Sequence, residues 1–168
     1  HTYKENLKQL LGQETKLTRK LHDTARLHPQ RVVFAEGGHP TTMKAAVQAK
    51  QEGICQPILL GNVDRLTRLA KRLELDLTGI DIVDMRADKE QGRRATFAKH
   101  IAEKRAREGL TFEEAYDKMY ERNYFGMSMV ETGDADAFIT GLYTRYSNTI
   151  KVAKEVIGIQ PGFGTFGT

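Results

Sequence analysis

Residues 31–38 read RVVFAEGG, and this stretch decides the fold. Val32, Val33 and Phe34 form a compact run of β-branched and aromatic residues, which is typical of a buried strand. Two glycines follow soon after, and they allow other groups to approach the backbone closely. We therefore expect a strand that leads into a loop and then into a helix.

The same unit recurs further along the chain. Thr41 or Thr42 can cap the helix that follows the loop, and CQPILLG, residues 55–61, reads as a second strand. Asn62 caps another helix, and GIDIVDM, residues 79–85, reads as a third strand. Parallel strands that alternate with helices need crossover connections. The sequence therefore predicts an α/β fold, with a doubly wound, mostly parallel sheet and helices on both faces.

Helices dominate the next part of the chain. One long helix is expected from about Asp88 to Glu108, and Thr111 with Glu114 has the spacing of a capping box that opens another. Asn123 is expected to interrupt this second helix, after which a short buried helix continues.

The two ends of the chain extend this pattern. Residues 137–140 are expected to form a fourth strand, and Ser147 or Asn148 to start a final helix. Before Pro29, leucines at three- and four-residue intervals mark one or two amphipathic helices. We therefore divide the chain into an amino-terminal helical arm, residues 1–28, and one α/β unit, residues 29–168.

Composition narrows the function classes. The 168 residues carry a net charge of +4, with 22 acidic side chains interleaved among 26 basic ones. This excess suits an anionic small molecule as well as a polynucleotide, but aromatic residues do not alternate with the basic ones, so no nucleic-acid partner is expected.

The apolar runs of the sequence are too short to cross a membrane. Cys55 is the only cysteine and the amino end lacks a secretory pattern, so we expect a reducing, cytoplasmic compartment.

Two loops would lie at the carboxyl ends of strands, where ligands bind in doubly wound sheets. The loop at residues 36–39, EGGH, is by itself more typical of a tight turn. The loop at residues 141–151, GLYTRYSNTIK, offers two cations and several hydroxyl groups around a helix start. It could bind a phosphoryl or carboxylate group, or it could be ordinary capping with solvated charge.

Three charged residues elsewhere also bear on the site. Arg105 lies four residues after Ile101 on an apolar helix face, so it should point inward, toward a protein carboxylate or a bound anion. Asp134 and Asp136 alternate like a pair of metal ligands. However, they precede the fourth strand and would lie at the wrong edge of the sheet, so we do not expect a metal there.

Six segments, in order, resemble the first half of the phosphate acetyl- and butyryltransferase family. They are PQRVVFAEG, EGICQPILLGN, GIDIVDM, REGLTFEEA, NYFGMSMVETGDADAFITG and NTIKVAKEVIG. The resemblance implies two α/β domains around a cleft, similar to isocitrate dehydrogenase, with this chain holding the first and stopping before the second. It also implies acyl transfer between coenzyme A and phosphate, and dimers.

The second loop departs from the transferring members of that family. They have a histidine followed by small hydroxyl residues, an arginine and a proline, where this chain has Thr144, Arg145, Tyr146, Lys151 and Val152. These residues are more similar to the domain fused to bacterial NADP-dependent malic enzymes, a regulatory and oligomerising module that senses acetyl-CoA. The parent would oxidatively decarboxylate malate to pyruvate, with NADP and Mg or Mn held outside this chain.

The resemblance and the loop position together give one set of predicted ligand-binding residues for acetyl-CoA or phosphate: Arg105, Thr144, Arg145, Tyr146, Ser147 and Lys151. No catalytic residue is expected within the chain. The alternative is a fragment of an active transferase that forms acetyl phosphate and CoA from acetyl-CoA and phosphate. The expected partners are a CoA ester, phosphate and further copies of the protein.

Overall fold

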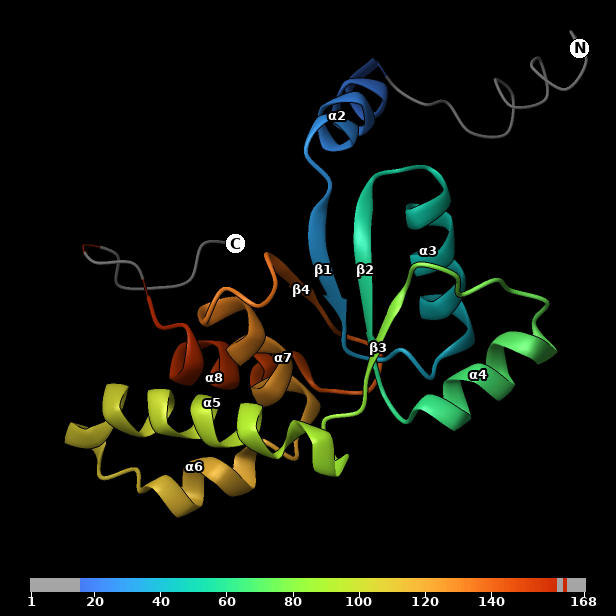
Figure 1. Ribbon diagram of the computed structural model, residues 1–168. Coiled ribbons are helices and arrows are strands. Elements are labelled where there is room, and N and C mark those ends of the chain that lie inside the picture. The colour runs from blue at the N-terminus through green and yellow to red at the C-terminus, as the bar shows by residue number, and fades with distance from the viewer. Residues whose placement is uncertain (1–15, 160–161, 163–168) are drawn as a thin grey trace, which may run out of the picture.

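The structure of the protein is a computed structural model that describes residues 16–159 and 162 (Figure 1). Its elements are, in order, α2 Lys16–Leu27, β1 Gln30–Phe34, α3 Pro40–Gln51, β2 Cys55–Leu60, α4 Val63–Arg72, β3 Asp81–Val83, the 3-10 turn η1 Asp88–Glu90, α5 Gln91–Lys104, the 3-10 turn η2 Ala106–Glu108, α6 Phe112–Lys118, α7 Arg122–Glu131, β4 Ala137–Ile139 and α8 Tyr146–Val156. The strand at residues 31–34 is therefore confirmed as β1.

The four strands form one parallel sheet in the order β3-β2-β1-β4. Val33 lies opposite Ile58 of β2 and Phe138 of β4, so β1 is central. The chain builds β1, β2 and β3 outward in one direction and then returns to add β4 on the other side of β1. This reversal makes the carboxyl ends of β1 and β4 the topological switch point of the sheet.

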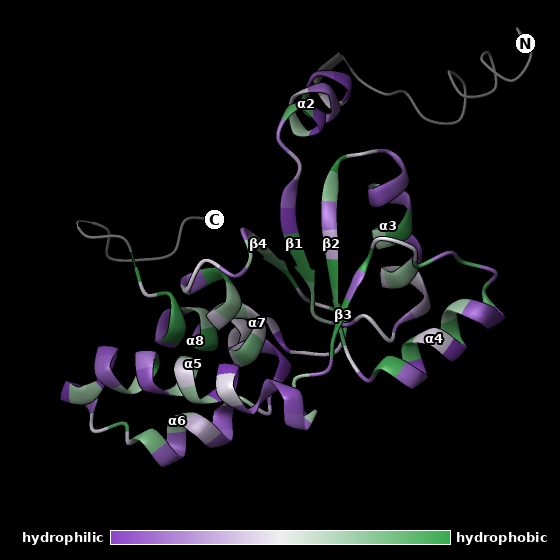
Figure 2. Ribbon diagram, in the orientation of Figure 1, coloured by the Kyte–Doolittle hydropathy of each residue, from purple (hydrophilic) through white to green (hydrophobic). Residues whose placement is uncertain are grey.

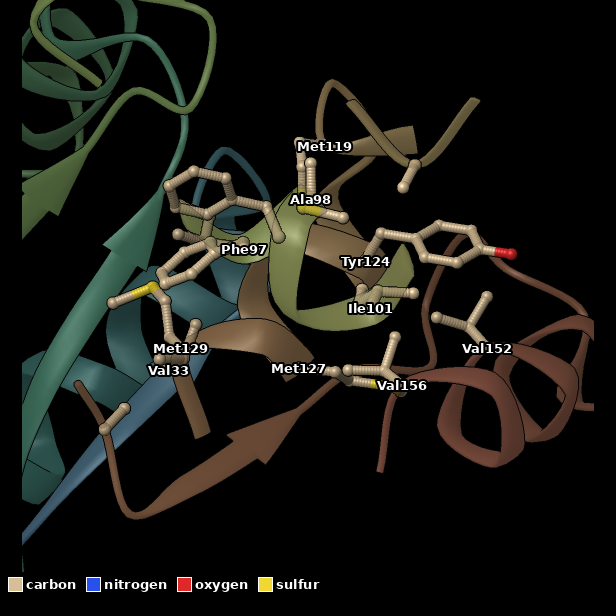
Figure 3. Close-up of a cluster of buried hydrophobic side chains, with 14 of the residues drawn as sticks. Val33, Phe97, Ala98, Ile101, Met119, Tyr124, Met127, Met129, Val152 and Val156 are labelled. Atoms are coloured by element: carbon tan, nitrogen blue, oxygen red, sulfur yellow. The ribbon is translucent and has the colours of Figure 1, made fainter. Parts of the chain in front are cut away.

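Helices cover both faces of the sheet, as the sequence predicts (Figure 1). Because side chains alternate across a strand, Val33 and Ile58 point to one face, while Phe34 and Leu59 point to the other. The first pair packs with α5, α7 and α8, and Figure 3 shows side chains from these elements meeting around Phe97 and Ile101. The second pair packs with α3 and α4. In Figure 2 the strands are green toward their carboxyl ends, although β1, β2 and β3 each include a purple segment, and purple segments recur along the helices.

Several helix boundaries differ from the sequence-based expectation. His39, and not Thr41 or Thr42, caps α3: its Nδ1 accepts from Thr41 N at 3.2 Å. The helix begins at Pro40 because proline has no backbone N–H that would need a partner at the first helical position. The long helix from Asp88 to Glu108 is broken at Arg105, which separates α5 from η2.

The second set of differences concerns the later helices. Asn123 does not interrupt a helix; it lies inside α7, and the break falls before Arg122. The final helix α8 begins at Tyr146, one residue before the expected Ser147. The capping box of Thr111 and Glu114 is confirmed.

The amino-terminal arm is described only in part. α2 ends at Leu27, before Pro29 as expected, and Arg26 Nε donates to Glu52 O at 2.7 Å. Leu21 and Leu27 are exposed. The predicted helical residues before position 16 lie outside the described part of the chain.

Gly126 allows α7 to lie directly against β4. A Cβ atom at this position would stand 2.3 Å from Phe138 Cε2 and 3.1 Å from Leu60 Cδ1. No side chain fits there without displacing the Phe138 ring, so the absence of a side chain fixes how closely the helix approaches the sheet.

Replacing Gly126 with alanine should lower the free energy of unfolding by about 1–3 kcal/mol, because the added methyl group overpacks the core. Gly92→Ala in α5 is the matched control, since nothing lies within 4 Å of its Cβ position. That variant should gain up to about 1 kcal/mol from helix propensity. Urea denaturation measures both; equal stabilisation by the two substitutions would show that α7 and β4 are not in close contact.

Arginine–carboxylate pairs close the amino edge of the sheet. Arg31 of β1 donates to both carboxylate oxygens of Asp136, from Nε at 3.1 Å and from NH2 at 2.8 Å. The backbone N–H of Arg31 also donates to this carboxylate at 2.8 Å. These hydrogen bonds lower the pKa of Asp136 to about 2.

This shift predicts a pH dependence of stability. A carboxylate whose pKa is depressed on folding stabilises the protein above its ordinary pKa and loses that contribution as the pH falls toward the folded value. Unfolding free energy should therefore fall between about pH 4 and pH 2, and Asp136→Asn should flatten this part of the curve. Asp117→Asn, at an exposed position of α6, serves as the control. An unchanged slope in the Asp136 variant would contradict the pairing.

Candidate functional site

A cavity of about 540 Å³ opens at the carboxyl edge of the sheet. Its walls come from the residues after β2 and β3, from the start of α7 and from the loop that leads into α8. The lining residues are Gly61, Asn62, Arg65, Asp84, Met85, Arg86, Tyr120, Glu121, Arg122, Asn123, Thr144 and Asn148. A second cavity of about 190 Å³ shares Gly61, Asn62, Arg65, Met85 and Arg122 with it and extends toward Glu36 and Tyr143.

Three helices present their amino termini to the larger cavity. Asn62 is the N-cap of α4, Glu121 is the N-cap of α7, and Thr144 precedes the N-cap of α8. The first N–H groups of a helix lack partners within the helix and carry a partial positive charge. The cavity is therefore suited to an anion.

Three guanidinium groups line the same cavity. Arg65 lies in the first turn of α4, Arg86 follows β3, and Arg122 opens α7. Arg122 also lies 5.7 Å from the centroid of the Tyr143 ring, and Tyr143 in turn contacts His39 edge to face at 5.6 Å. Arginine matches phosphate and carboxylate with parallel hydrogen bonds.

Sequence reasoning missed these three arginines. Each stands beside a helix start or a strand end at the carboxyl edge, and this position is the signal that could have identified them.

The rim of the cavity is held by side-chain hydrogen bonds. Asn62 Oδ1 accepts from Arg65 N at 3.1 Å, and Asn62 Nδ2 donates to Asp84 Oδ2 at 2.9 Å. Buried Arg94 donates to Met85 O at 2.6 Å and to Ala87 O at 2.9 Å. The loops after β2 and β3 are thus joined to each other and anchored to α5.

Gly61 keeps the cavity open at this rim. Its φ of 151° lies in the region that favours glycine, and a Cβ atom there would stand 2.7 Å from Leu66 Cδ1. The backbone between β2 and α4 is therefore exposed to the cavity without a covering side chain.

A buried carboxylate spans the switch point. Glu36 is 3% exposed, and its Oε1 accepts from Thr140 Oγ1 at 2.9 Å and from Gly141 N at 3.2 Å. The loops after β1 and β4 are therefore fixed to each other. The EGGH loop is thus more than a tight turn, because it positions the loop that carries Thr144.

Only part of the predicted residue set lies at the cavity. Thr144 lines it, as does its neighbour Asn148, which was named in the same loop. Arg145, Tyr146, Ser147 and Lys151 are exposed and are not among the residues that line it. Their role in ligand binding stays a prediction.

Comparison with known proteins now identifies the family. Residues 16–168 match the family model described as phosphate acetyl/butaryl transferase. The chain belongs to this family. The resemblance stated from the sequence, to this family and to its version fused to malic enzymes, is thereby confirmed.

Two curated relatives represent the two versions of this transferase family. An NADP-dependent malic enzyme of Rhizobium meliloti is 31% identical over 151 residues, which are 88% of this chain and 19% of that protein. A phosphate acetyltransferase of Thermoanaerobacterium thermosaccharolyticum is 30% identical over 140 residues, which are 83% of this chain and 41% of that protein. The chain thus spans between about a fifth and two fifths of the length of these relatives.

Solved structures of transferase-family members agree on the fold. A phosphotransacetylase from Staphylococcus aureus matches with a TM-score of 0.72 at 25% identity, covering 88% of this chain and 44% of that chain. One from Streptococcus pyogenes gives a TM-score of 0.73 at 25% identity, covering 88% and 45%.

Arg105 lies away from the cavity, at the other end of α8. Its Nε donates to Glu155 O at 2.8 Å, its Nη2 donates to Lys154 O, and its Nη1 pairs with the Glu108 carboxylate at 2.9 Å. Lys154 and Glu155 follow Tyr146, the first residue of α8, by eight and nine residues, so these carbonyl groups lie about 12–14 Å along the axis from the start of the helix. Arg105 therefore does not converge with Arg145, although it does point inward as expected.

The two aspartates before β4 are ion-paired. Asp136 pairs with Arg31, and Asp134 Oδ2 accepts from Arg93 NH2 at 2.8 Å. Among residues 16–159 and 162, no group of three or more His, Cys, Asp and Glu could hold a metal ion. In the same part of the chain, no helix is both long and apolar enough to cross a membrane.

A variant separates the two possible roles of Arg105. Arg105→Ala should lower the unfolding free energy by about 1–3 kcal/mol, because three charge-assisted hydrogen bonds are lost. Exposed Arg107→Ala should change it by less than about 0.5 kcal/mol. Urea denaturation with and without phosphate checks this: unaltered stability together with weaker phosphate binding would instead support the ligand role predicted from sequence.

Proposed function

We propose that the chain is a regulatory and oligomerising segment of a hybrid NADP-dependent malic enzyme, and that it binds acetyl-CoA or phosphate at the cavity described above. The parent would oxidatively decarboxylate malate to pyruvate. Acetyl-CoA would be the effector, and copies of the parent would associate through this segment.

The observation that carries the binding proposal is the convergence of positive charge on one cavity. Arg65, Arg86 and Arg122 line it together with the starts of three helices. Asp84 and Glu121 are the acidic residues there, and the Asp84 carboxylate is engaged by Asn62. An anionic ligand would therefore meet donors that are already in place.

Two observations support the regulatory reading. The R. meliloti relative is a malic enzyme, and it aligns with 88% of this chain. The chain has Thr144 and Arg145 before α8 and Tyr146 at its start, where the transferring members of the family that it resembles have a histidine and small hydroxyl residues. Tyr146 is 72% exposed and Arg145 is also exposed, so both are free to meet a ligand or another subunit.

The cofactors of the proposed parent would lie elsewhere. NADP and a divalent metal, Mg or Mn, would be held by the malate-oxidising domain. The proposed compartment is the cytoplasm, where malate, NADP and acetyl-CoA meet.

A paired assay on the full-length parent tests the function. Acetyl-CoA is expected to alter malate-dependent NADP reduction, and no acetyl phosphate is expected from acetyl-CoA and phosphate. Formation of acetyl phosphate without malate oxidation would instead establish an ordinary phosphate acetyltransferase and overturn the regulatory proposal.

A binding experiment on this chain tests the cavity. Arg122→Gln should weaken phosphate binding about tenfold or more, because a hydrogen bond to a charged group contributes about 1.5–3 kcal/mol. Arg107→Gln removes the same charge from the exposed 3-10 turn η2 and should leave affinity unchanged. Isothermal titration calorimetry measures both, and equal affinities in the two variants would remove Arg122 from the site.

A further inference from the structure

A second group of cations runs along the outer side of α4. Arg65, Arg68, Lys71 and Arg72, which we call the basic stripe, are all exposed and together line a groove of about 530 Å³. Positions 65, 68 and 72 are separated by three and four residues, so their side chains share one side of the helix. The stripe extends about 10 Å along the helix axis.

The cations of the basic stripe have no carboxylate partner in the part of the chain that the structure describes. Within residues 16–159 and 162, none of the four forms an ion pair, and neither does Asp64, the carboxylate on this side in the first turn of α4. Arg31 and Arg93, near the opposite edge of the sheet, are by contrast both engaged by aspartates. Four neighbouring cations repel one another, and a bound polyanion would relieve this repulsion.

The basic stripe is continuous with the candidate site. Arg65 lines the two cavities at the carboxyl edge of the sheet as well as the groove on α4. A ligand that reaches from the cavity along α4 would therefore pass from Arg65 to Arg68 and then to Arg72. A small ion such as phosphate is too short to reach both ends.

We infer that the basic stripe binds the phosphate-bearing nucleotide end of an extended ligand whose other end lies in the cavity. The inference rests on the proposed function, because a CoA ester is the ligand there that carries several phosphate groups remote from its thioester. The cavity takes the anion or the acyl end, and the stripe supplies affinity and discriminates against shorter ligands.

The test compares three ligands on two charge-matched double variants. Arg68→Gln with Arg72→Gln removes two charges from the stripe, and both substitutions keep good helix propensity. Lys99→Gln with Arg107→Gln removes two charges from α5 and η2, which Figure 1 shows on the far side of the molecule from α4. Calorimetry with CoA, pantetheine and inorganic phosphate reports the three parts of the ligand separately.

The stripe variant is expected to bind CoA at least tenfold more weakly than wild type and to lose much of the salt dependence of that binding. Its phosphate and pantetheine affinities should be unchanged, and the control variant should match wild type for all three ligands. Circular dichroism and urea unfolding verify that both variants are folded.

Three results would overturn the inference. Equal CoA affinity in the stripe variant and wild type would show that the nucleotide end lies elsewhere. Phosphate binding by wild type without any CoA binding would also refute the stripe, while leaving the cavity intact. Binding of neither ligand by wild type would refute the proposed function as well, so the two failures are distinguishable.

Discussion

The contact on which the candidate site depends is the buried Glu36 carboxylate. Parallel strands that are added in two directions from a central strand leave a crevice between the loops outside their carboxyl ends where the direction reverses, and here that point lies at β1 and β4. Glu36 joins the two loops there by accepting from Thr140 and from the backbone of Gly141. A buried carboxylate is costly unless it is hydrogen-bonded, so these two donors stabilise the position of both loops. The loop that carries Thr144 is therefore held where it can line the cavity.

Much of the fold was predictable because it follows from local patterns. The run Val32-Val33-Phe34 forms a central strand, since it can bury side chains on both faces of the sheet. The capping box at Thr111 was correct for the same reason, because its two reciprocal hydrogen bonds involve residues three positions apart. By contrast, the α3 cap was wrong: Pro40 fits the first helical position, which moves the N-cap back to His39.

The site was predicted less well, because it depends on which elements meet in space. The family motif indicated the loop before α8, and Thr144 does line the cavity. Arg65, Arg86 and Arg122 come from three segments far apart in the sequence, and no periodicity within one segment reveals that they converge. Arg105 illustrates the opposite case. Its position on an apolar helix face was read correctly as inward-pointing, and it meets a protein carboxylate, Glu108, and two carbonyl groups at the end of α8. Its role in ligand binding stays a prediction.

The position of α8 links the two ends of this arrangement. Lys104, the last residue of α5, donates to Val156 O and Ile157 O. Arg105, the next residue, donates to Lys154 O and Glu155 O. Two consecutive cations therefore bind the carboxyl end of α8, where the helix dipole is negative. Glu155 of the same helix pairs with Lys118 and accepts from the Tyr124 hydroxyl at 2.7 Å. Burial raises the pKa of the Glu155 carboxyl, but these hydrogen bonds outweigh it, and the net result is a lowered pKa. The side chain of Tyr124 lies beside Val152 in Figure 3. Residues of α5, α6 and α7 all form hydrogen bonds with the carboxyl-terminal half of α8. An anion that binds at the amino terminus of α8 therefore contacts a helix that cannot rotate independently of these three helices. Any displacement caused by the ligand must then move these helices together, and this is the property that a segment needs if ligand binding is to be transmitted to a neighbouring subunit.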